Sequence, residues 1–409
     1  MRKSAQNKKN YAEPWQISFE ERARYLQSCI DDKCQIVLHL NEEPNTTTFR
    51  YRCYNVFRWL QSSKKWRAVY FFLDEFPKLK HYLPNISIAI VSRMRWSFEL
   101  QRFMDILRDA GKPILYDTDD LVFDVELLPM LVSTISADMD YYFSYISRCG
   151  YAASLTDGFT TTNSFLGNRL TDKYGKPYVI IPNSLNQEQL DISRNILSKK
   201  STTDAPIVAP ETTPATTQPR PNTPFTIGYF SGTNTHNNDF NEVLPELISL
   251  MEKYPDINLE IVGFLTLPRE AMPLFKAKRI KQRKLVNMME LQQLISQVDV
   301  NIAPLTINVF TQCKSELKYF EAAIVETITC ATPTGVFKDC ITHGENGFLC
   351  KQGEWFNTIE SIYQGNINRN QISKTAHKQA TERYSGKQLT EQIEAAYDKI
   401  LGETLEQRK

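Results

Sequence analysis

The sequence of 409 residues has almost no excess of charge of either sign, because 48 lysines and arginines are balanced by 47 aspartates and glutamates. Proteins that bind nucleic acid usually carry a basic excess or a basic stripe, so we expect no nucleic-acid partner. The balance does not exclude small anionic ligands, since a few local lysines are enough to bind a phosphate.

Cysteine pairs and metal-ligand patterns are also missing. The eight cysteines contain no Cys-x-x-Cys pair, and they form no metal-binding spacing with the five histidines. Scattered free thiols in a chain of this length are typical of a reducing compartment. We therefore predict a cytoplasmic protein with no metal and no cofactor.

Long apolar runs are absent. No stretch has the roughly 20 consecutive apolar residues that a membrane-spanning helix needs, and the basic residues 1–10 lack the apolar core of a signal peptide. Residues 15–30 are predicted to form a packing helix behind a solvated tail. The alternative is that this helix and its basic leader make a peripheral contact with the inner face of the membrane.

The length indicates two domains or three. Residues 201–224 consist mainly of Thr, Pro and Ala with no hydrophobic period, so they cannot bury enough apolar surface to offset the entropy of ordering. We predict an N-terminal extension (1–33), a first domain (34–195), a linker (196–224), a second domain (225–385) and a C-terminal helix (386–409).

Strand-like apolar runs alternate with helical runs in both halves, which predicts an α/β fold with parallel sheets. In the first half, strands are expected at 35–40, 68–73, 86–91, 114–116 and 178–181, and helices at 51–60, 98–107 and 136–154. In the second half, strands are expected at 225–230, 259–262, 284–286 and 300–303, and helices at 240–251, 289–298, 355–363, 372–384 and 389–401. Ligands of such sheets collect beyond the carboxyl ends of the strands.

The stretch from Cys313 to Ala323 has the pattern of a helix with two different faces. The apolar face, which should pack on a sheet, holds Leu317, Phe320 and Ile324. The neighbouring charged face holds three residues one turn apart, namely Lys314, Lys318 and Glu321.

Thr311 is the expected N-cap of this helix, so free backbone N–H groups would lie near Lys314 and Ser315. A helix N-terminus with a lysine beside it is an anion site, and Glu321, further along, can accept hydrogen bonds from a sugar diol. The alternative is an ordinary amphipathic helix whose lysines are solvated.

The strand 225–230 is followed by a second candidate anion site. Gly232 allows the backbone to approach a phosphate closely, and the next helix points its N-terminus at the same place. The loop lacks G-x-G-x-x-G, so a nicotinamide site is not expected. His236 either contacts the phosphates or bonds locally at the start of the helix.

Three motifs follow one another in the second half: K-S-x-L-K-x-x-E-A-A from Lys314, A-T-P-T-G at 331–335 and H-G-E-N-G-F-L at 343–349. Together they resemble the C-terminal nucleotide-sugar half of GT-B glycosyltransferases of the retaining, family-4 type. The sequence Ile-Pro-Asn-Ser at 181–184 resembles the end of the N-terminal domain in this superfamily.

The resemblance implies two Rossmann-like domains that face each other across a cleft, with a C-terminal helix crossing back to the first. It implies an enzyme of hexosyltransferase type that moves a sugar, with retention, from a nucleotide diphosphate-sugar donor to a glycan or lipid-linked acceptor, in the synthesis of surface polysaccharide or glycoconjugate. The alternative is a non-catalytic GT-B partner or a glycan-binding subunit of a glycosyltransferase system.

The resemblance also assigns residues to the donor. The glutamate at the position of Glu321 binds the ribose, basic residues near the helix start hold the diphosphate, and the loop after the strand at 284–286 follows the nucleobase. The catalytic residues are then Lys314 and Glu321. The expected donor-binding residues are Gly232, Thr233, His236, Val286, Asn287, Lys314, Ser315, Lys318 and Glu321.

The sequence departs from the family pattern in three places. The loop after residue 230 lacks the usual Arg and Lys. The diphosphate would therefore be bound mainly by backbone amides, Thr233, His236 and Lys314. Cys313 replaces a common glutamate. Glu326 and Ile328 stand where the helix exit normally reads G-x-P, so the turn there is expected to differ.

Two loops of the first domain are assigned to the acceptor side. Arg50 and Arg52 follow the first strand, and they contact a phosphate of the acceptor or the donor, or form surface ion pairs. The cluster Asp117–Asp120 follows another strand. Asp117 and Asp119 would suit Mg²⁺ or Mn²⁺ in a metal-dependent enzyme. The resemblance instead implies a loop at the edge of the cleft that binds no metal. In that loop, Asp119 or Asp120 is a candidate for contact with the acceptor.

Overall fold

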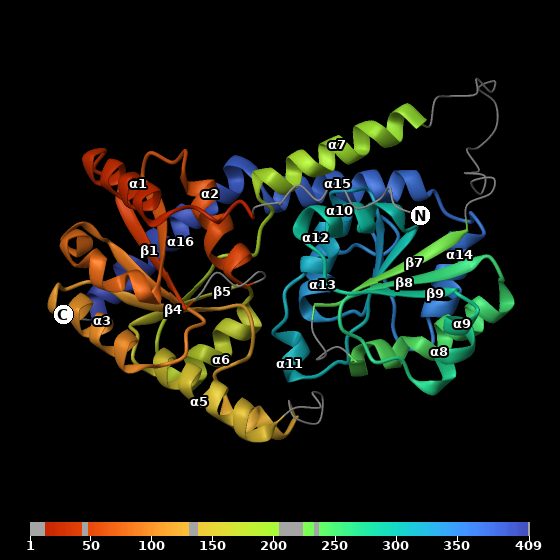
Figure 1. The fold of residues 1–409 in the computed structure, drawn as a ribbon, viewed down its shortest axis with the longest axis horizontal. Coiled ribbons are helices and arrows are strands. Elements are labelled where there is room, and N and C mark those ends of the chain that lie inside the picture. The colour runs from red at the N-terminus through yellow and green to blue at the C-terminus, as the bar shows by residue number, and fades with distance from the viewer. Residues whose placement is uncertain (1–12, 43–47, 131–137, 204–223, 233–236, 408–409) are drawn as a thin grey trace, which may run out of the picture.

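The computed structural model describes residues 13–42, 48–130, 138–203, 224–232 and 237–407 (Figure 1). The described chain forms two α/β domains side by side, each built on a six-stranded sheet whose neighbouring strands are all parallel. The predicted pair of Rossmann-like domains is confirmed.

The sheet of the first domain has the order β2-β1-β3-β4-β5-β6. Its strands are β1 (Gln35–Asn41), β2 (Trp66–Phe72), β3 (Ile88–Ser92), β4 (Ile114–Thr118), β5 (Gly158–Thr161) and β6 (Tyr178–Ile180). The apolar runs mark β1 to β4 because strands covered on both faces are almost continuously hydrophobic. No strand was predicted at β5, whose threonines are buried.

The helical elements of the first domain are α1 (Phe19–Asp31), a π-helical turn η1 (Arg50–Tyr54), α2 (Asn55–Leu60), the 3₁₀ segments η2 (Leu73–Asn85) and η3 (Val125–Leu127), α3 (Phe98–Asp109), α5 (Met139–Ser154), α6 (Ser164–Tyr174) and α7 (Gln187–Thr203). Ser18 caps α1 by accepting a hydrogen bond from the Glu21 N–H. Leu26 and Cys29 of α1 lie in the core of the first domain, so the predicted packing helix is present.

The sheet of the second domain has the order β12-β11-β10-β7-β8-β9. Its strands are β7 (Phe225–Phe230), β8 (Ile257–Val262), β9 (Ile280–Arg283), β10 (Val300–Ala303), β11 (Ile328–Ala331) and β12 (Phe348–Leu349). The strand order reverses between β7 and β10, which makes their carboxyl ends the topological switch point where such sheets bind ligands. The strand expected at 284–286 is wrong: the edge strand is β9, and only Ile280 of it is buried.

The helical elements of the second domain are α8 (Asn237–Lys253), η5 (Arg269–Ala271), α9 (Met272–Lys276), α10 (Met288–Gln297), α11 (Val309–Gln312), α12 (Leu317–Ala323), α13 (Gly335–Cys340), α14 (Trp355–Tyr363), α15 (Arg369–Tyr384) and α16 (Gly386–Gln407). The expected helix from Cys313 is interrupted, because α11 ends at Gln312 and α12 begins at Leu317. Asn308, not Thr311, caps the first piece, accepting from the Thr311 N–H at 2.9 Å. Lys314 and Ser315 therefore lie in a connection before α12.

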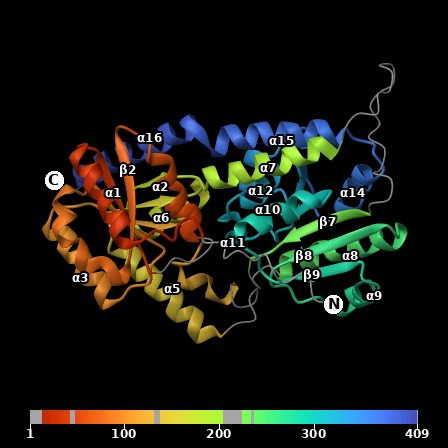
Figure 2. The ribbon, with the colours of Figure 1, turned by 45° about the horizontal axis from the view of Figure 1, so that its top comes forward.

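Two helices join the domains (Figure 2). The last helix, α16, crosses back as expected, and it buries Leu389, Ile393, Tyr397 and Ile400 in the first-domain cluster that contains Trp66. The boundary expected at 195 falls inside α7, which continues to the second domain, where the Lys200 ammonium donates to the Val325 carbonyl at 3.3 Å. Residues 204–223 of the predicted linker lie outside the described residues.

Candidate functional site

The switch point of the second sheet is bordered by Ser231 and Gly232 after β7 and by the loop after β10. Among the described residues, no atom lies within 4 Å of where a side chain would begin at Gly232. A Cβ at Gly263 (φ +111°) would lie 1.6 Å from the Ser231 carbonyl oxygen, so only glycine allows these two loops to pack together. Thr233 and His236 lie outside the described residues.

Lys318 of α12 points toward β7. Its ammonium is buried without a hydrogen-bond partner among the described residues, 4.9 Å from the ring centroid of Tyr229. Burial lowers its pKa to about 8, although Asp239 and Glu321 act in the opposite direction. Buried polar groups are normally hydrogen-bonded, so an unpartnered ammonium at a switch point marks a candidate binding site.

Glu321, one turn after Lys318, is contacted by two side chains from the first domain. The Arg50 guanidinium donates to its carboxylate at 3.1 Å, and the Tyr51 hydroxyl donates to the same oxygen. Arg50 was expected on the acceptor side, whereas here it contacts the residue expected to hold the donor ribose.

Lys314 forms the second bridge between the domains. Its ammonium lies 3.2 Å from Asp120 and 4.1 Å from the ring centroid of Phe310. Burial opposes ionisation of Asp120, but the charges of Lys314 and Arg93 outweigh it and hold the Asp120 pKa below its ordinary value. Burial raises the pKa of Asp119, which Arg93 contacts at 3.3 Å.

The connection before α12 is held by amide side chains of the first domain. Asn183 donates to the Ser315 hydroxyl at 2.9 Å. Asn163 donates to the carbonyl oxygens of Cys313 and Lys314 at 3.2 and 3.3 Å. The predicted arrangement, in which Lys314 and Ser315 sit inside the first turn of a continuous helix, is therefore corrected: both residues meet the first domain through this connection.

Arg52 and Asp117 form a buried pair inside the first domain. Two guanidinium nitrogens of Arg52 donate to Asp117 at 2.7 and 3.0 Å, and a third donates to the Ile181 carbonyl at 2.6 Å. The Arg52 side chain has 0% exposure, so neither the expected surface ion pair nor contact with a phosphate fits this conformation.

The carboxylates of the Asp117–Asp120 cluster form hydrogen bonds and ion pairs with other side chains of the protein. Asp117 also accepts from the Thr160 hydroxyl at 2.6 Å, so both of its oxygens are engaged. Within the described ranges, no group of three or more His, Cys, Asp or Glu side chains could hold a metal ion.

Arg93 belongs to the site but was missed in the sequence. It follows β3 with φ +48°, a backbone conformation that is costly for a residue with a side chain and is found at functional sites. Its guanidinium reaches Asp119, Asp120 (3.6 Å) and the Tyr145 hydroxyl (3.1 Å). Its place directly after the strand predicted at 86–91 was the available signal.

The remaining residues singled out in the sequence take part in packing, helix capping or backbone turns. Val286 packs on the cluster containing Ile295, and Asn287 caps α10 by accepting from the Glu290 N–H at 2.9 Å. The Glu326 backbone adopts φ +56°, so the helix exit keeps a left-handed turn without glycine, contrary to the expected difference. Cys313 is buried, and burial raises its pKa to about 12.

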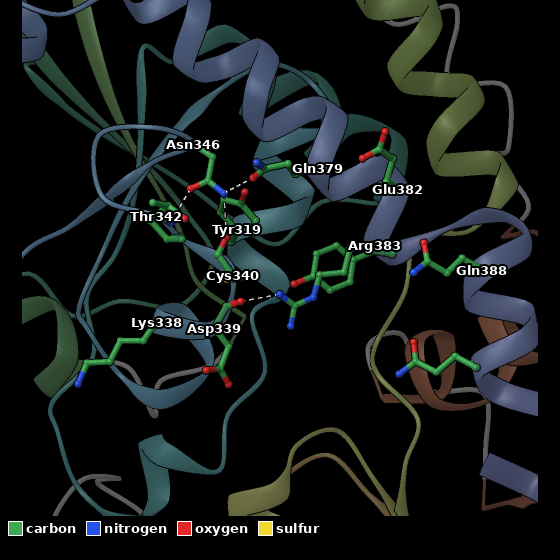
Figure 3. Close-up of a pocket in the computed structure, with 13 residues that line it drawn as sticks. Tyr319, Lys338, Asp339, Cys340, Thr342, Asn346, Gln379, Glu382, Arg383 and Gln388 are labelled. Atoms are coloured by element: carbon green, nitrogen blue, oxygen red, sulfur yellow. Dashed lines mark hydrogen bonds between the residues drawn. The ribbon is translucent and has the colours of Figure 1, made fainter. Parts of the chain in front are cut away.

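Two cavities lie away from this cluster. One, of about 360 Å³, lies between α13, α15 and α16; in Figure 3 Asn346 points to Gln379 and Arg383 to Asp339 in its wall. The other, of about 680 Å³, is an apolar groove between η2 and α3 that includes Phe76, Leu83 and Phe103. Neither is lined by a predicted site residue.

Comparison with known proteins defines the class. Residues 224–364 match the family model described as glycosyl transferases group 1. A search of curated proteins found no match to the sequence.

Solved structures with the same fold include HepE of Anabaena bound to UDP (TM-score 0.54, 13% identity, 89% of this chain and 100% of that chain). A glycosyltransferase of Rickettsia africae has a TM-score of 0.57 and 12% identity, over 90% of this chain and 99% of that chain. Sucrose-phosphate synthase of Thermosynechococcus elongatus has a TM-score of 0.55 and 11% identity, over 90% of this chain and 99% of that chain.

The chain therefore has the GT-B fold, as the motifs indicated. Within that fold, residues 224–364 of the second domain are similar to the glycosyl transferases group 1 family.

Proposed function

We propose that the protein transfers a hexose, with retention, from a nucleotide diphosphate-sugar to a glycan or lipid-linked acceptor in the synthesis of surface polysaccharide or glycoconjugate. The observation that carries the proposal is the buried, unpartnered ammonium of Lys318 at the switch point, with Lys314 and Glu321 on either side of it in the chain. HepE, which has the same fold, has been solved with UDP, with UDP and glucose, and with UDP-glucose.

In the proposed donor complex, Lys318 and Lys314 bind the diphosphate and Glu321 accepts hydrogen bonds from the ribose hydroxyls. Lys314 pairs with Asp120 in this structure, so in the proposed complex the diphosphate would take the place of one anion, Asp120, at this lysine. Charge-assisted hydrogen bonds of this kind are about twice as strong as neutral ones.

The chemical step is proposed to rest on the departing diphosphate. Cations fixed at the place where negative charge develops stabilise the transition state without reorganisation. The bond between the anomeric carbon and the diphosphate oxygen breaks, the acceptor oxygen bonds to the same face of the sugar, and the acceptor proton passes to the diphosphate. The first domain contributes the acceptor side, where Arg93 holds Asp119 and Asp120 in place.

The groove between η2 and α3 supports a lipid-linked acceptor. Its apolar floor includes Leu73, Phe76 and Phe103, and charged residues, among them Glu42 directly after β1 at the carboxyl edge of the first sheet, line the rest together with Asp74, Lys80, Glu99 and Arg102. An apolar groove at that edge suits the hydrocarbon part of an acceptor whose sugar reaches the switch point.

The proposed setting is the cytoplasm, without a metal cofactor and with peripheral contact to the inner face of the membrane as the route to a lipid-linked acceptor. In the part of the chain that the structure describes, no helix is long and apolar enough to cross a membrane.

Thermal unfolding with UDP, GDP and dTDP tests the donor assignment. A ligand that binds only the folded protein raises the melting temperature, by an amount that grows with its concentration above the dissociation constant. We expect one of the three nucleotides to do so, Lys314→Ala and Lys318→Met to reduce the shift, and Lys387→Ala on the exposed side of α16 to leave it unchanged. Incubation with the matching nucleotide-sugar and NMR of the product anomer then test transfer and retention.

A non-catalytic GT-B partner is the second candidate. It is favoured by the two ion pairs that neutralise Lys314 and Glu321, and by Cys313 at a position where related enzymes commonly carry a glutamate. Absence of any stabilisation by the three nucleotides would decide for this candidate.

A further inference from the structure

A diphosphate carries more negative charge than the loop after β7 can match. Residues 231–240 contain no Arg or Lys, and Lys318 and Lys314 are the two cations that α12 and its preceding connection bring to the switch point. We therefore searched the first domain for a further cation that reaches the same place.

Arg50 is that cation. It belongs to η1 of the first domain, yet its guanidinium lies 3.1 Å from Glu321 of the second domain and 2.7 Å from the Tyr51 hydroxyl. The Arg50 side chain is 7% exposed, its guanidinium stacks over the Tyr51 ring at 4.4 Å, and its Nε is buried without a hydrogen-bond partner among the described residues.

We propose that Arg50, which contacts Glu321 in this structure, is a donor-binding residue whose guanidinium binds the diphosphate when the nucleotide ribose binds Glu321. The inference deepens the proposed function and rests on it. In this view the first domain supplies the cation that the loop after β7 lacks.

The argument is one of charge. An arginine cannot lose its proton in a protein, and a buried charge that loses its partner is strongly destabilising. Arg50 and Tyr51 both contact Oε1 of Glu321, and the carboxylate of Glu13 also acts on Arg50. Ribose hydroxyls that bind Glu321 compete with Arg50 for its negative charge, so a further anion beside Arg50 would compensate for that competition. The diphosphate is covalently attached to that ribose, so it arrives in the same binding event.

The other two arginines of the region have different partners. The Arg52 guanidinium binds Asp117 and the Ile181 carbonyl. Arg93 is paired with Asp119 and Asp120. Among the described ion pairs, Arg50 is the one arginine of the first domain whose partner lies in the second. Of the roles that the sequence left open for Arg50, a phosphate of the acceptor, a phosphate of the donor or a surface ion pair, this favours the donor.

The test compares a nucleoside diphosphate with its nucleoside, using calorimetry on the full chain. The pair is whichever of UDP, GDP or dTDP stabilises the wild type, and uridine, guanosine or thymidine to match. For Arg50→Gln we expect the diphosphate to bind roughly ten- to a hundredfold more weakly. We expect the nucleoside to bind as well as or better than to the wild type, because Glu321 has lost a competitor.

Arg95→Gln is the matched control, because Arg95 pairs with Glu42 inside the first domain and should leave both affinities unchanged. Arg50→Lys keeps the charge and should lie between wild type and Arg50→Gln; it also serves if Arg50→Gln unfolds. Equal loss for nucleoside and diphosphate, or no loss for either, would overturn the inference. A raised KM for the acceptor alone would return Arg50 to the acceptor side.

Failure of the two proposals can be told apart. If the wild type binds no nucleoside diphosphate, the proposed function fails and this inference fails with it. If the wild type binds one and Arg50→Gln binds it equally well, only the role of Arg50 is wrong.

Discussion

The ammonium of Lys318 lies 4.9 Å from the ring centroid of Tyr229, at the end of β7, and has no hydrogen-bond partner in the described part of the chain. A ring face attracts a cation but does not replace the hydrogen bonds that the ammonium made in water. The arrangement is therefore costly without a ligand, and an anion at the switch point would satisfy it.

Nucleoside diphosphate binding should weaken as the pH rises above 8. Burial lowers the pKa of Lys318 to about 8, so the free protein carries the charged lysine below that pH and the neutral one above it. The nucleotide itself is fully ionised there, since a phosphate loses its second proton near pH 6. We expect the affinity to fall by up to about tenfold per pH unit between pH 8 and 9.5, measured by calorimetry.

Lys318→Met provides the comparison for this profile. It should bind more weakly at pH 7 and show a flat profile over the same range, while Lys387→Met should follow the wild type. Parallel profiles for wild type and Lys318→Met would show that another group titrates.

Removing one member of the buried Arg52–Asp117 pair should destabilise the first domain. The remaining charge would be left without a partner in a place with 0% and 2% side-chain exposure. We expect Arg52→Ala to cost about 3–5 kcal/mol. Urea denaturation followed by tryptophan fluorescence measures this, since four of the five tryptophans precede residue 100.

The matched control for that loss is Arg194→Ala. Arg194 pairs with Asp191 on the exposed surface of α7, and exposed pairs contribute less than about 1 kcal/mol. Similar losses for the two variants would mean that burial does not set the strength of the Arg52 pair.

Glu326→Gly should stabilise the protein. Glu326 holds φ +56° at the exit of α12, where a side chain costs about 1–2 kcal/mol and glycine does not. Glycine also gives the unfolded chain more freedom, so we expect a net gain of about 0.5–1 kcal/mol. Glu326→Ala keeps the Cβ and should show no such gain; a gain in both variants would point to the charge of Glu326 instead.

Chelation should leave transfer unchanged. Arg52 and Thr160 occupy the oxygens of Asp117, and Arg93 contacts Asp119 and Asp120. The initial rate of sugar transfer is therefore expected to be the same with and without EDTA. Loss of activity in EDTA and recovery with Mg²⁺ or Mn²⁺ would support the metal-dependent alternative.

The strands that were predicted correctly are those whose signal is local. Val37, Leu38, Ile302 and their neighbours belong to strands covered on both faces, which gives an unbroken apolar run. No strand was predicted at β5, β11 or β12, which have four, four and two residues, and β9, an exposed edge, was misplaced. Strands this short, or exposed like β9, carry too little apolar pattern to be located from the sequence alone.

The site residues also divide into those that local spacing predicts and those that it cannot. Helical spacing placed Lys318 and Glu321 together, because three residues are one turn of a helix. Their partners could not be read from spacing: Arg50 is 271 residues from Glu321 in the chain, and Asp120 is 194 residues from Lys314. Such pairs form only when the two domains come together.

The last helix has a consequence for how the chain must be made. Ile393, Tyr397 and Ile400 fill the core around Trp66, although more than 300 residues separate the two in order of synthesis. A nascent first domain therefore emerges from the ribosome with an apolar gap that only its final segment can close. The two halves mature together rather than in sequence, and cutting the chain at residue 224 would yield a first half with an unfilled interior.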